Sequence, residues 1–156
     1  MESRPGIIPY EEAQMNQHLH IITLGVKDLE ISKKFYAETL GWKTSRPQDD
    51  IAFFQAGGVV LAIYPRDKLA EDALVSPESE GTGFSGITLA YNARSESEVD
   101  EIISDLKAKG VKIVKEPQKA FWGGYSSYFA DPDDYRWEVA YNPLFPFDEN
   151  GNVKLD

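Results

Sequence analysis

The stretch WGGYSSYFADPDDYRWEVAYNP, residues 122–143, predicts a β-hairpin. Residues 125–129 have the composition of one strand and residues 135–141 that of a second. Between them Pro132 suits the first central position of a tight turn, and the flanking aspartates can bond their own backbone. The hairpin is therefore the element from which we work outward.

The second strand of this hairpin divides its side chains between two faces. Because side chains alternate along a pleated strand, Trp137 and Val139 point one way while Arg136 and Glu138 point the other. The two bulky apolar groups require a core. We therefore expect Glu138 to face a wetter hollow, in front of which the protein performs its function.

Composition bounds the class of protein. The 156 residues suffice for one domain or two small modules, and 42% hydrophobic with 27% charged residues is typical of a globular protein. The chain contains no apolar run of about 20 residues and no secretory pattern, so we expect a cytoplasmic protein without a membrane span. Zero cysteines exclude disulfides and thiolate chemistry.

The formal charge of −10 disfavours nucleic acid and anionic membranes as partners. An acidic chain is expected to repel polyanions and to attract a cationic ligand, unless the charge serves only solubility. Phosphoryl transfer, NAD chemistry and a serine relay are excluded as well, because the corresponding glycine loops and histidine placement are missing.

The first half of the chain is predicted to form one strand, one helix and three further strands, a βαβββ module. A strand is predicted over 18–26, followed by a helix that Asp28 can cap and Gly41 can end. Three further strands are predicted at residues 42–46, 51–56 and 59–64. Gly57 and Gly58 suit the two-residue loop that joins the last two.

The same pattern restarts after a polar linker. A strand is predicted over 84–91, and Ser95 with Glu98 forms a capping box for a helix that Gly110 ends. A strand over 111–115 and the hairpin complete the second module. Within the linker a short helix over 68–74 is an option.

The two modules also share a short sequence, since Ile22-Thr23-Leu24 recurs as Ile87-Thr88-Leu89. One βαβββ unit cannot bury both faces of its sheet, so two units are expected to pair around a cup. The predicted fold class is α+β. The divisions are an arm at 1–16, a module at 17–65, a linker at 66–83, a module at 84–143 and a tail at 144–156 with a turn at Asn150-Gly151.

Three segments, ITLGVKDLEISKKFYAETLGW, GITLAYNARSESEVDEIISDLKAKGV and YFADPDDYRWEVAYNP, resemble the vicinal oxygen chelate superfamily. That family includes glyoxalase I, fosfomycin-resistance thiol transferases, extradiol dioxygenases, methylmalonyl-CoA epimerase and bleomycin-resistance proteins. The resemblance covers roughly residues 18–143. It implies the two-module cup, a small-molecule ligand and a homodimer.

The resemblance also implies where a divalent metal would be held. Its four ligand positions fall on Ile21, Ala62, Gly86 and Glu138, of which only Glu138 offers a donor atom. A divalent cation needs several oxygen or nitrogen donors, so we expect no cofactor, with a metal as the alternative. His18 and His20 are expected to face away from the cup, unless a one-residue bulge turns His20 inward.

Alternation places a set of side chains in the cup, and the glycines after Trp122 predict a rim. The expected ligand-binding residues are Thr23, Tyr64, Thr88, Trp122, Ser126, Tyr128, Arg136 and Glu138. The position of Tyr128 matches a substrate-contacting tyrosine of the fosfomycin-resistance branch. Simpler alternatives are that Trp122 and Tyr128 only pack and that Arg136 only neutralises Glu138.

Three functions remain open. The first is a metal-free protein, similar to the bleomycin-resistance branch, that sequesters a small aromatic or cationic molecule. The second is a lactoylglutathione lyase-like lyase, isomerase or epimerase that uses Glu138 as general base or residual metal ligand. The third is an interaction module whose cup is filled by its own side chains.

Overall fold

The structure, a computed structural model, describes residues 17–74, 84–85 and 87–155 of the chain. Module one consists of β1 (Ile21–Val26), α1 (Leu29–Lys34), the π-helical segment η1 (Phe35–Thr39), β2 (Thr44–Ser45), β3 (Ala52–Ala56) and β4 (Val59–Pro65). The helix α2 (Arg66–Asp72) follows it. Module two consists of β5 (Thr88–Asn92), α3 (Glu96–Ala108), β6 (Lys112–Lys119), β7 (Tyr125–Ala130) and β8 (Arg136–Tyr141).

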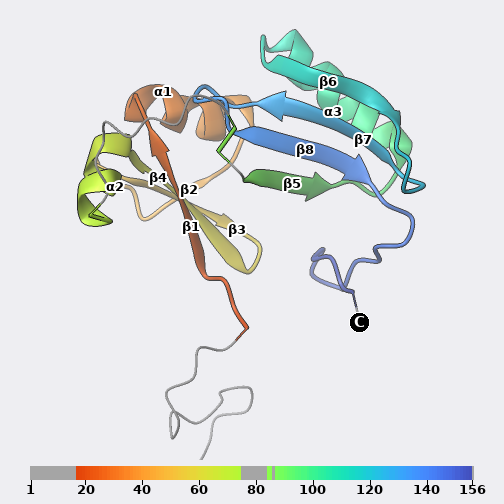
Figure 1. Cartoon of the computed structure of the whole chain (residues 1–156), viewed down its shortest axis with the longest axis horizontal. Helices are drawn as coiled ribbons and strands as arrows, with labels where there is room; N and C mark the ends of the chain where they lie inside the picture. Colours follow the sequence, from red (N-terminus) through yellow and green to blue (C-terminus); the bar gives the residue numbers. More distant parts are fainter. Residues whose placement is uncertain (1–16, 75–83, 86, 156) are drawn as a thin grey trace, which may run out of the picture.

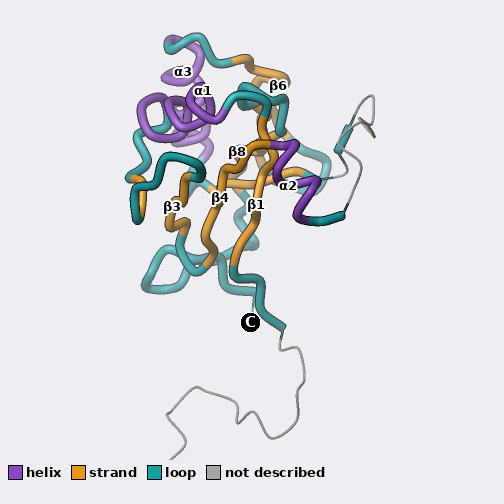
Figure 2. Tube along the Cα trace, turned by 90° about the vertical axis from the view of Figure 1, so that its left-hand side faces the viewer, coloured by secondary structure: helices purple, strands orange, loops and turns teal. Residues whose placement is uncertain are grey.

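The two modules have the same strand order. The first sheet runs β1-β4-β3-β2 and the second β5-β8-β7-β6. In each sheet the first and last strands of the module pair in parallel, and the other pairs are antiparallel. Figure 1 shows the two sheets beside each other, and Figure 2 shows β3, β4 and β1 in order across the first. The α+β class and the duplicated topology predicted from the sequence are confirmed.

The helices α1 and α3 begin as the sequence predicts. The Asp28 carboxylate accepts a hydrogen bond from the Ile31 backbone N–H at 3.1 Å, and the Ser95 hydroxyl accepts one from the Glu98 N–H at 3.0 Å. Each bond satisfies one of the donors that a helix start leaves free. After α3 the chain turns at Gly110 with φ of +82°, a conformation that glycine adopts without steric cost.

Several element boundaries differ from the predicted ones. The strands predicted over 18–26 and 84–91 are shorter and begin at Ile21 and Thr88. The strand predicted over 42–46 is reduced to β2, which ends where Arg46 turns out of the strand with φ of +46°. The strand predicted over 111–115 continues to Lys119, with register shifts in its pairing to β7 that accommodate a proline. The short linker helix is present but begins at Arg66.

The arm at 1–16 and half of the linker, 75–83, lie outside the described residues, as does Gly86. Within the described residues no helix is long and apolar enough to cross a membrane. At the other end, the predicted turn at Asn150-Gly151 is present, with φ of +80° at Gly151. The Asp148 carboxylate accepts the N–H of Asn150 and of Asn152, each at 2.9 Å.

One core joins the two modules, and Tyr36 lies at its centre. This side chain on η1 is fully buried. Its ring lies 5.8 Å from that of Phe54 in the first sheet and 6.2 Å from that of Trp137 in the second. The apolar face of β8 predicted from alternation, Trp137 with Val139, is buried in the same core. The polar face of β8 is therefore left on the opposite, open side of the sheet.

Candidate functional site

The turn between β7 and β8 is held by a buried carboxylate. Asp131 accepts the backbone N–H of Asp133 at 2.9 Å and of Tyr135 at 2.8 Å. It also accepts the Tyr36 hydroxyl at 2.7 Å, and that hydroxyl in turn accepts the Trp137 indole N–H at 3.2 Å. Burial raises the pKa of the Asp131 carboxyl, although the hydrogen bonds oppose the shift. The aspartate thus organises the turn and connects it to module one.

The same turn contacts the end of β1 and the start of α1 through two further residues. The Asp133 carboxylate accepts the Lys27 backbone N–H at 2.9 Å and the Ser32 hydroxyl at 3.2 Å. The Tyr135 hydroxyl donates to the Gly25 carbonyl at 2.9 Å. Figure 1 shows the turn reaching α1 and β1. The sequence predicted that these aspartates bond their own backbone, but it did not reveal this second role.

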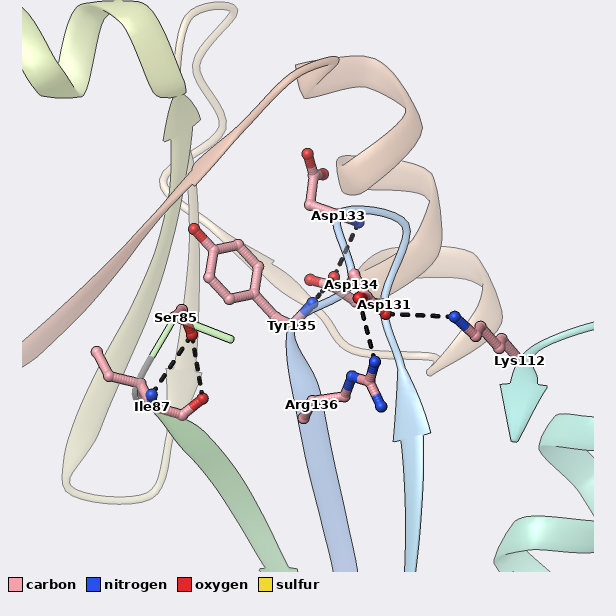
Figure 3. Close-up of polar contacts among 8 residues, drawn as sticks. All are labelled: Ser85, Ile87, Lys112, Asp131, Asp133, Asp134, Tyr135 and Arg136. Carbon is pink, nitrogen blue, oxygen red and sulfur yellow. Dashed lines mark hydrogen bonds and ion pairs between the residues drawn. The ribbon is translucent and has the colours of Figure 1, made fainter. Parts of the chain in front are cut away.

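Asp134 closes the turn and holds Arg136. Its φ is +67°, a positive value that aspartate adopts more readily than most residues other than glycine. Its carboxylate pairs with Arg136 at 3.2 Å and with Lys112 at 3.5 Å, and the Arg136 bond lowers the pKa of Asp134 (Figure 3). Among the described residues Arg136 forms no ion pair with Glu138. The alternative that Arg136 simply neutralises Glu138 is therefore not what the structure shows.

A cavity of about 940 Å³ lies between the end of β1 and the open face of the second sheet. We call it the intermodule cavity. Its walls include three of the residues expected to bind ligand, Thr88, Tyr128 and Arg136. They come from β5, β7 and β8, which are neighbours in the second sheet. The Tyr135 ring and the side chains of Phe84 and Val114 add apolar surface.

Glu138 lies beside this cavity. It is half-buried and directly opposite Tyr128 in the pairing of β7 with β8. The pKa of the Tyr128 hydroxyl is raised by burial and by the Glu138 charge, and Thr88 opposes the shift. The carboxylate, the phenol and the threonine hydroxyl therefore form one polar group at the edge of the cavity.

The other expected residues are outside the cavity lining. Ser126 is buried on the same face, opposite Ala140. Tyr64 is half-buried and pairs with Gly25, while Thr23 is exposed on β1. These residues share the predicted faces but not the cavity.

Trp122 lies in the turn before β7 and packs on a glycine. A Cβ atom on Gly124 would lie 1.7 Å from the Trp122 ring and 2.5 Å from the Tyr141 carbonyl oxygen. The ring therefore occupies the space above Gly124. This contact agrees with the interpretation of Trp122 as a packed turn residue, and the residue is absent from the cavity lining.

The positions at which the resemblance places metal ligands carry few donor atoms. Ile21 is 52% exposed and Ala62 is 1% exposed, and neither side chain has a donor atom. Gly86 lies outside the described residues, so Glu138 is the one donor found. Within residues 17–74, 84–85 and 87–155 no three His, Asp or Glu side chains cluster as a metal site would require. The described donor set does not fit a divalent ion.

The two histidines precede β1 and are exposed. Their rings meet edge to face at 5.6 Å. The β1–β4 register runs without a shift from Ile21 onward, and the Val60 N–H donates to the His20 carbonyl at 2.9 Å. The described strand β1 therefore has no bulge of the kind that would turn His20 inward.

Three cationic residues in the cavity wall were missed by the sequence analysis. Lys27 directly follows β1 and Arg66 directly follows β4, and these parallel neighbours end at the same edge. The position of Lys27 and Arg66 directly after two predicted strands could therefore have indicated from the sequence that they lie close together. Lys115 faces the cavity after a register shift in β6, which strict alternation does not predict.

Comparison with known proteins agrees with this architecture. A glyoxalase-related enzyme from Fulvimarina pelagi is 36% identical, with a TM-score of 0.79 over 89% of this chain and 98% of that one. The uncharacterized protein YqjT of Bacillus subtilis is 28% identical over 128 residues, covering 78% of this chain and 97% of that protein. Lactoylglutathione lyase GLX1 of Arabidopsis thaliana is 26% identical over 145 residues, covering 89% of this chain but only 49% of that enzyme.

The family model described as Glyoxalase/Bleomycin resistance protein/Dioxygenase superfamily matches residues 18–139, which run from just before β1 of module one to Val139 in β8 of module two. The resemblance seen in the sequence is confirmed, and the chain belongs to this superfamily.

Proposed function

We propose that this protein binds a small organic molecule in the intermodule cavity and does so without a divalent metal. The observation that carries the proposal is the cavity itself, about 940 Å³ between the modules and lined by Thr88, Tyr128 and Arg136. Small-molecule sites usually combine apolar walls with a few convergent polar groups. Here the polar groups include two hydroxyls and a guanidinium, and aromatic rings with Val114 supply apolar surface.

The donor chemistry supports the metal-free part of the proposal. Two of the family's ligand positions carry the aliphatic side chains of Ile21 and Ala62. A single carboxylate, Glu138, leaves a divalent ion with too few protein ligands. Ligand binding is therefore expected to depend on the cavity wall alone.

The test uses chelator-treated full-length protein and a set of aromatic fragments observed by saturation-transfer NMR. We expect binding that Thr88→Trp abolishes, because the indole projects into the cavity and blocks the surface beside Tyr128 and Arg136. Ser104→Trp, on the exposed face of α3, is the matched control and should leave binding unchanged. Fragments that bind both variants equally well would place the ligand elsewhere.

A second measurement concerns the metal. Adding Mn²⁺, Ni²⁺ or Zn²⁺ should shift Tm by less than about 1 °C, because an ion that does not bind the native state cannot stabilise it. Fragment affinities should also be the same with and without these ions. One tightly retained metal per chain, required for binding, would contradict the proposal.

A second candidate function is an enzyme that uses Glu138 as a general base. Glu138 is half-buried, adjoins the Tyr128 hydroxyl and forms no ion pair among the described residues. One relative is a lactoylglutathione lyase by name. If this chain turns over lactoylglutathione, Glu138→Gln should lower kcat by about 100-fold or more. If it only binds, the substitution changes Kd and no turnover is detected.

We also propose a homodimer. The strands β1 and β5 are sheet edges, and Ile21 and Ile87 near them are 52% and 54% exposed. Exposed edges carrying large apolar side chains favour association. Sedimentation should give twice the chain mass, and Ile21→Lys should shift the protein toward monomer. A wild-type monomer at micromolar concentration would contradict this.

A further inference from the structure

The intermodule cavity has the opposite charge to the chain as a whole. The sequence has 26 acidic and 16 basic residues, for a net charge of −10. The cavity wall nevertheless contains two lysines and two arginines but only two carboxylates. The cationic residues are Lys27, Arg66, Lys115 and Arg136. The sign of the local charge is therefore not the sign that the overall composition suggests.

Both carboxylates in the wall are already engaged. Asp134 pairs with Arg136 and Lys112, and Asp133 accepts the Lys27 backbone N–H and the Ser32 hydroxyl. Among the residues that the structure describes, no ion pair involves Lys27, Arg66 or Lys115.

The fold brings two of these cations together where the strands β1 and β4 of module one end. Val26 and Pro65 are partners at the end of the β1–β4 pairing. Lys27 directly follows β1 and Arg66 directly follows β4, so the two residues lie at the same edge of the first sheet. Gly25 permits this arrangement, because a Cβ atom there would lie only 3.2 Å from the Arg66 Cα. The glycine thus lets the first turn of α2 approach β1, and Arg66 is placed by the backbone.

Module two supplies the third cation from across the cavity. Lys115 on β6 is paired with Tyr128 on β7, beyond a register shift that follows Ile113. Its half-buried side chain and the Tyr128 hydroxyl line the same wall. Phe84 and Val114 add apolar surface beside them.

We infer that the ligand of this cavity is a small organic anion, with a carboxylate or phosphate group bound by Arg66, Lys27 and Lys115. Its apolar part packs on Phe84, Val114 and Tyr128. The inference rests on the proposed small-molecule site and names the class of molecule that fills it. Charge-assisted hydrogen bonds from arginine and lysine to an oxyanion are stronger than neutral ones, and partial burial strengthens them further. The expectation of a cationic ligand, drawn from net charge, is replaced.

The test compares compounds of one shape and different charge by isothermal titration calorimetry. Benzoate and phenyl phosphate are the anions, benzamide is the neutral counterpart and benzylamine the cation. We expect at least one anion to bind about tenfold more tightly than benzamide, as a charge-assisted hydrogen bond implies. Its Kd should also rise with added NaCl. The preferred anion distinguishes a phosphate from a carboxylate ligand.

Variants locate the effect. Arg66→Gln and Lys115→Gln should each raise the Kd of the preferred anion about tenfold and leave that of benzamide unchanged. Lys68→Gln removes the same charge from an exposed position on α2 outside the cavity wall and should change neither. If one cavity variant fails to fold, the other still locates the effect, and the salt dependence of the wild type still reports an electrostatic contribution to binding.

The outcomes separate this inference from the proposed function. If benzamide or benzylamine binds as tightly as the anions, the anion specificity is refuted and the small-molecule site remains. If anion binding is unchanged in both cavity variants, the specificity is likewise refuted at this position. If no compound of any charge binds, both the site and its specificity are refuted.

Discussion

In module one, Ile21, Thr23 and Ala62 face the open side of the first sheet. In module two, Tyr128, Arg136 and Glu138 face the open side of the second sheet. The strand order is identical in the two sheets. The closing strand, which holds Ala62 in module one and Glu138 in module two, pairs in parallel with the opening strand in both cases. One open face is nevertheless mainly aliphatic and the other carries charge.

This difference shows which parts of a duplicated fold are constrained. Both modules retain capped helices and an apolar face that joins the common core. The open faces contribute little to that core, so their residues can diverge while the topology persists. In this chain most of the polar groups of the predicted site lie on module two. Module one contributes cations only where β1 and β4 end.

The largest expected effect comes from giving module one the residue of module two. Ala62→Glu places a carboxylate where the native side chain is 1% exposed, and should lower the free energy of unfolding by about 4 kcal/mol. The reverse change, Glu138→Ala, should cost less than about 1 kcal/mol because Glu138 is half-buried and forms no ion pair among the described residues. Urea denaturation measures both. Equal costs would show that the two faces are equally tolerant.

A second comparison is between two glycines next to turns. Gly124→Ala should destabilise the protein by about 3 kcal/mol, because the new methyl group would overlap the Trp122 ring and the Tyr141 carbonyl. Gly58→Ala, where nothing lies within 4 Å of the new atom, should change stability by less than about 0.5 kcal/mol. Thermal unfolding followed by circular dichroism measures the difference. A small effect at Gly124 would mean that Trp122 is free to move off the turn.

The third prediction tests the contact between the modules. Tyr36→Phe removes the hydroxyl that donates to Asp131 and accepts from Trp137, and leaves a buried carboxylate oxygen without its donor. A cost of about 2 kcal/mol is expected. Tyr125→Phe removes an exposed hydroxyl bonded to Asp100 at 2.6 Å and should cost about 0.5 kcal/mol. Similar losses for the two variants in urea denaturation would contradict the role of Tyr36 at the interface.

Most of the fold was predictable because it is set by local signals. Asp28 and Ser95 cap the helices as their side chains predict, and alternation on β8 assigns Trp137 to the core. The repeat of Ile-Thr-Leu then relates one half of the chain to the other. Boundaries were less predictable where chain geometry overrides composition. Arg46, for example, ends β2 early by turning to positive φ.

The candidate site was only partly predictable. Alternation identified Thr88, Tyr128 and Arg136, since these lie on strands of one sheet. It could not identify Lys27 and Arg66, because their position opposite module two depends on how the modules dock. That docking uses the turn at Asp131, whose bonds to another module have no sequence signature. Net charge could not reveal the cations of the cavity wall for a related reason, since it sums over the whole chain and says nothing about one cavity.

The smallest predicted effect concerns pH and again distinguishes the two hairpin turns. Module one closes at Gly57 and Gly58 without a carboxylate, whereas module two closes around buried Asp131, whose pKa is raised above 3.8. The native state therefore holds this proton at pH values where the unfolded chain has released it. Stability from this group is present at low pH and is lost as pH rises from about 4 through the folded-state pKa.

The measurement is the difference in unfolding free energy between wild type and Asp131→Asn, which should decrease over that interval and then stay constant. Asp148 provides the opposite sign, because hydrogen bonds from the Asn152 and Asn150 backbone lower its pKa below 3.8. Its contribution is present above pH about 4 and is lost as pH falls through the folded-state pKa, so the difference from Asp148→Asn should increase with pH. If both differences rise with pH, the Asp131 carboxylate is stabilised as an ion by its three donors, and the turn resists acid less than its burial implies.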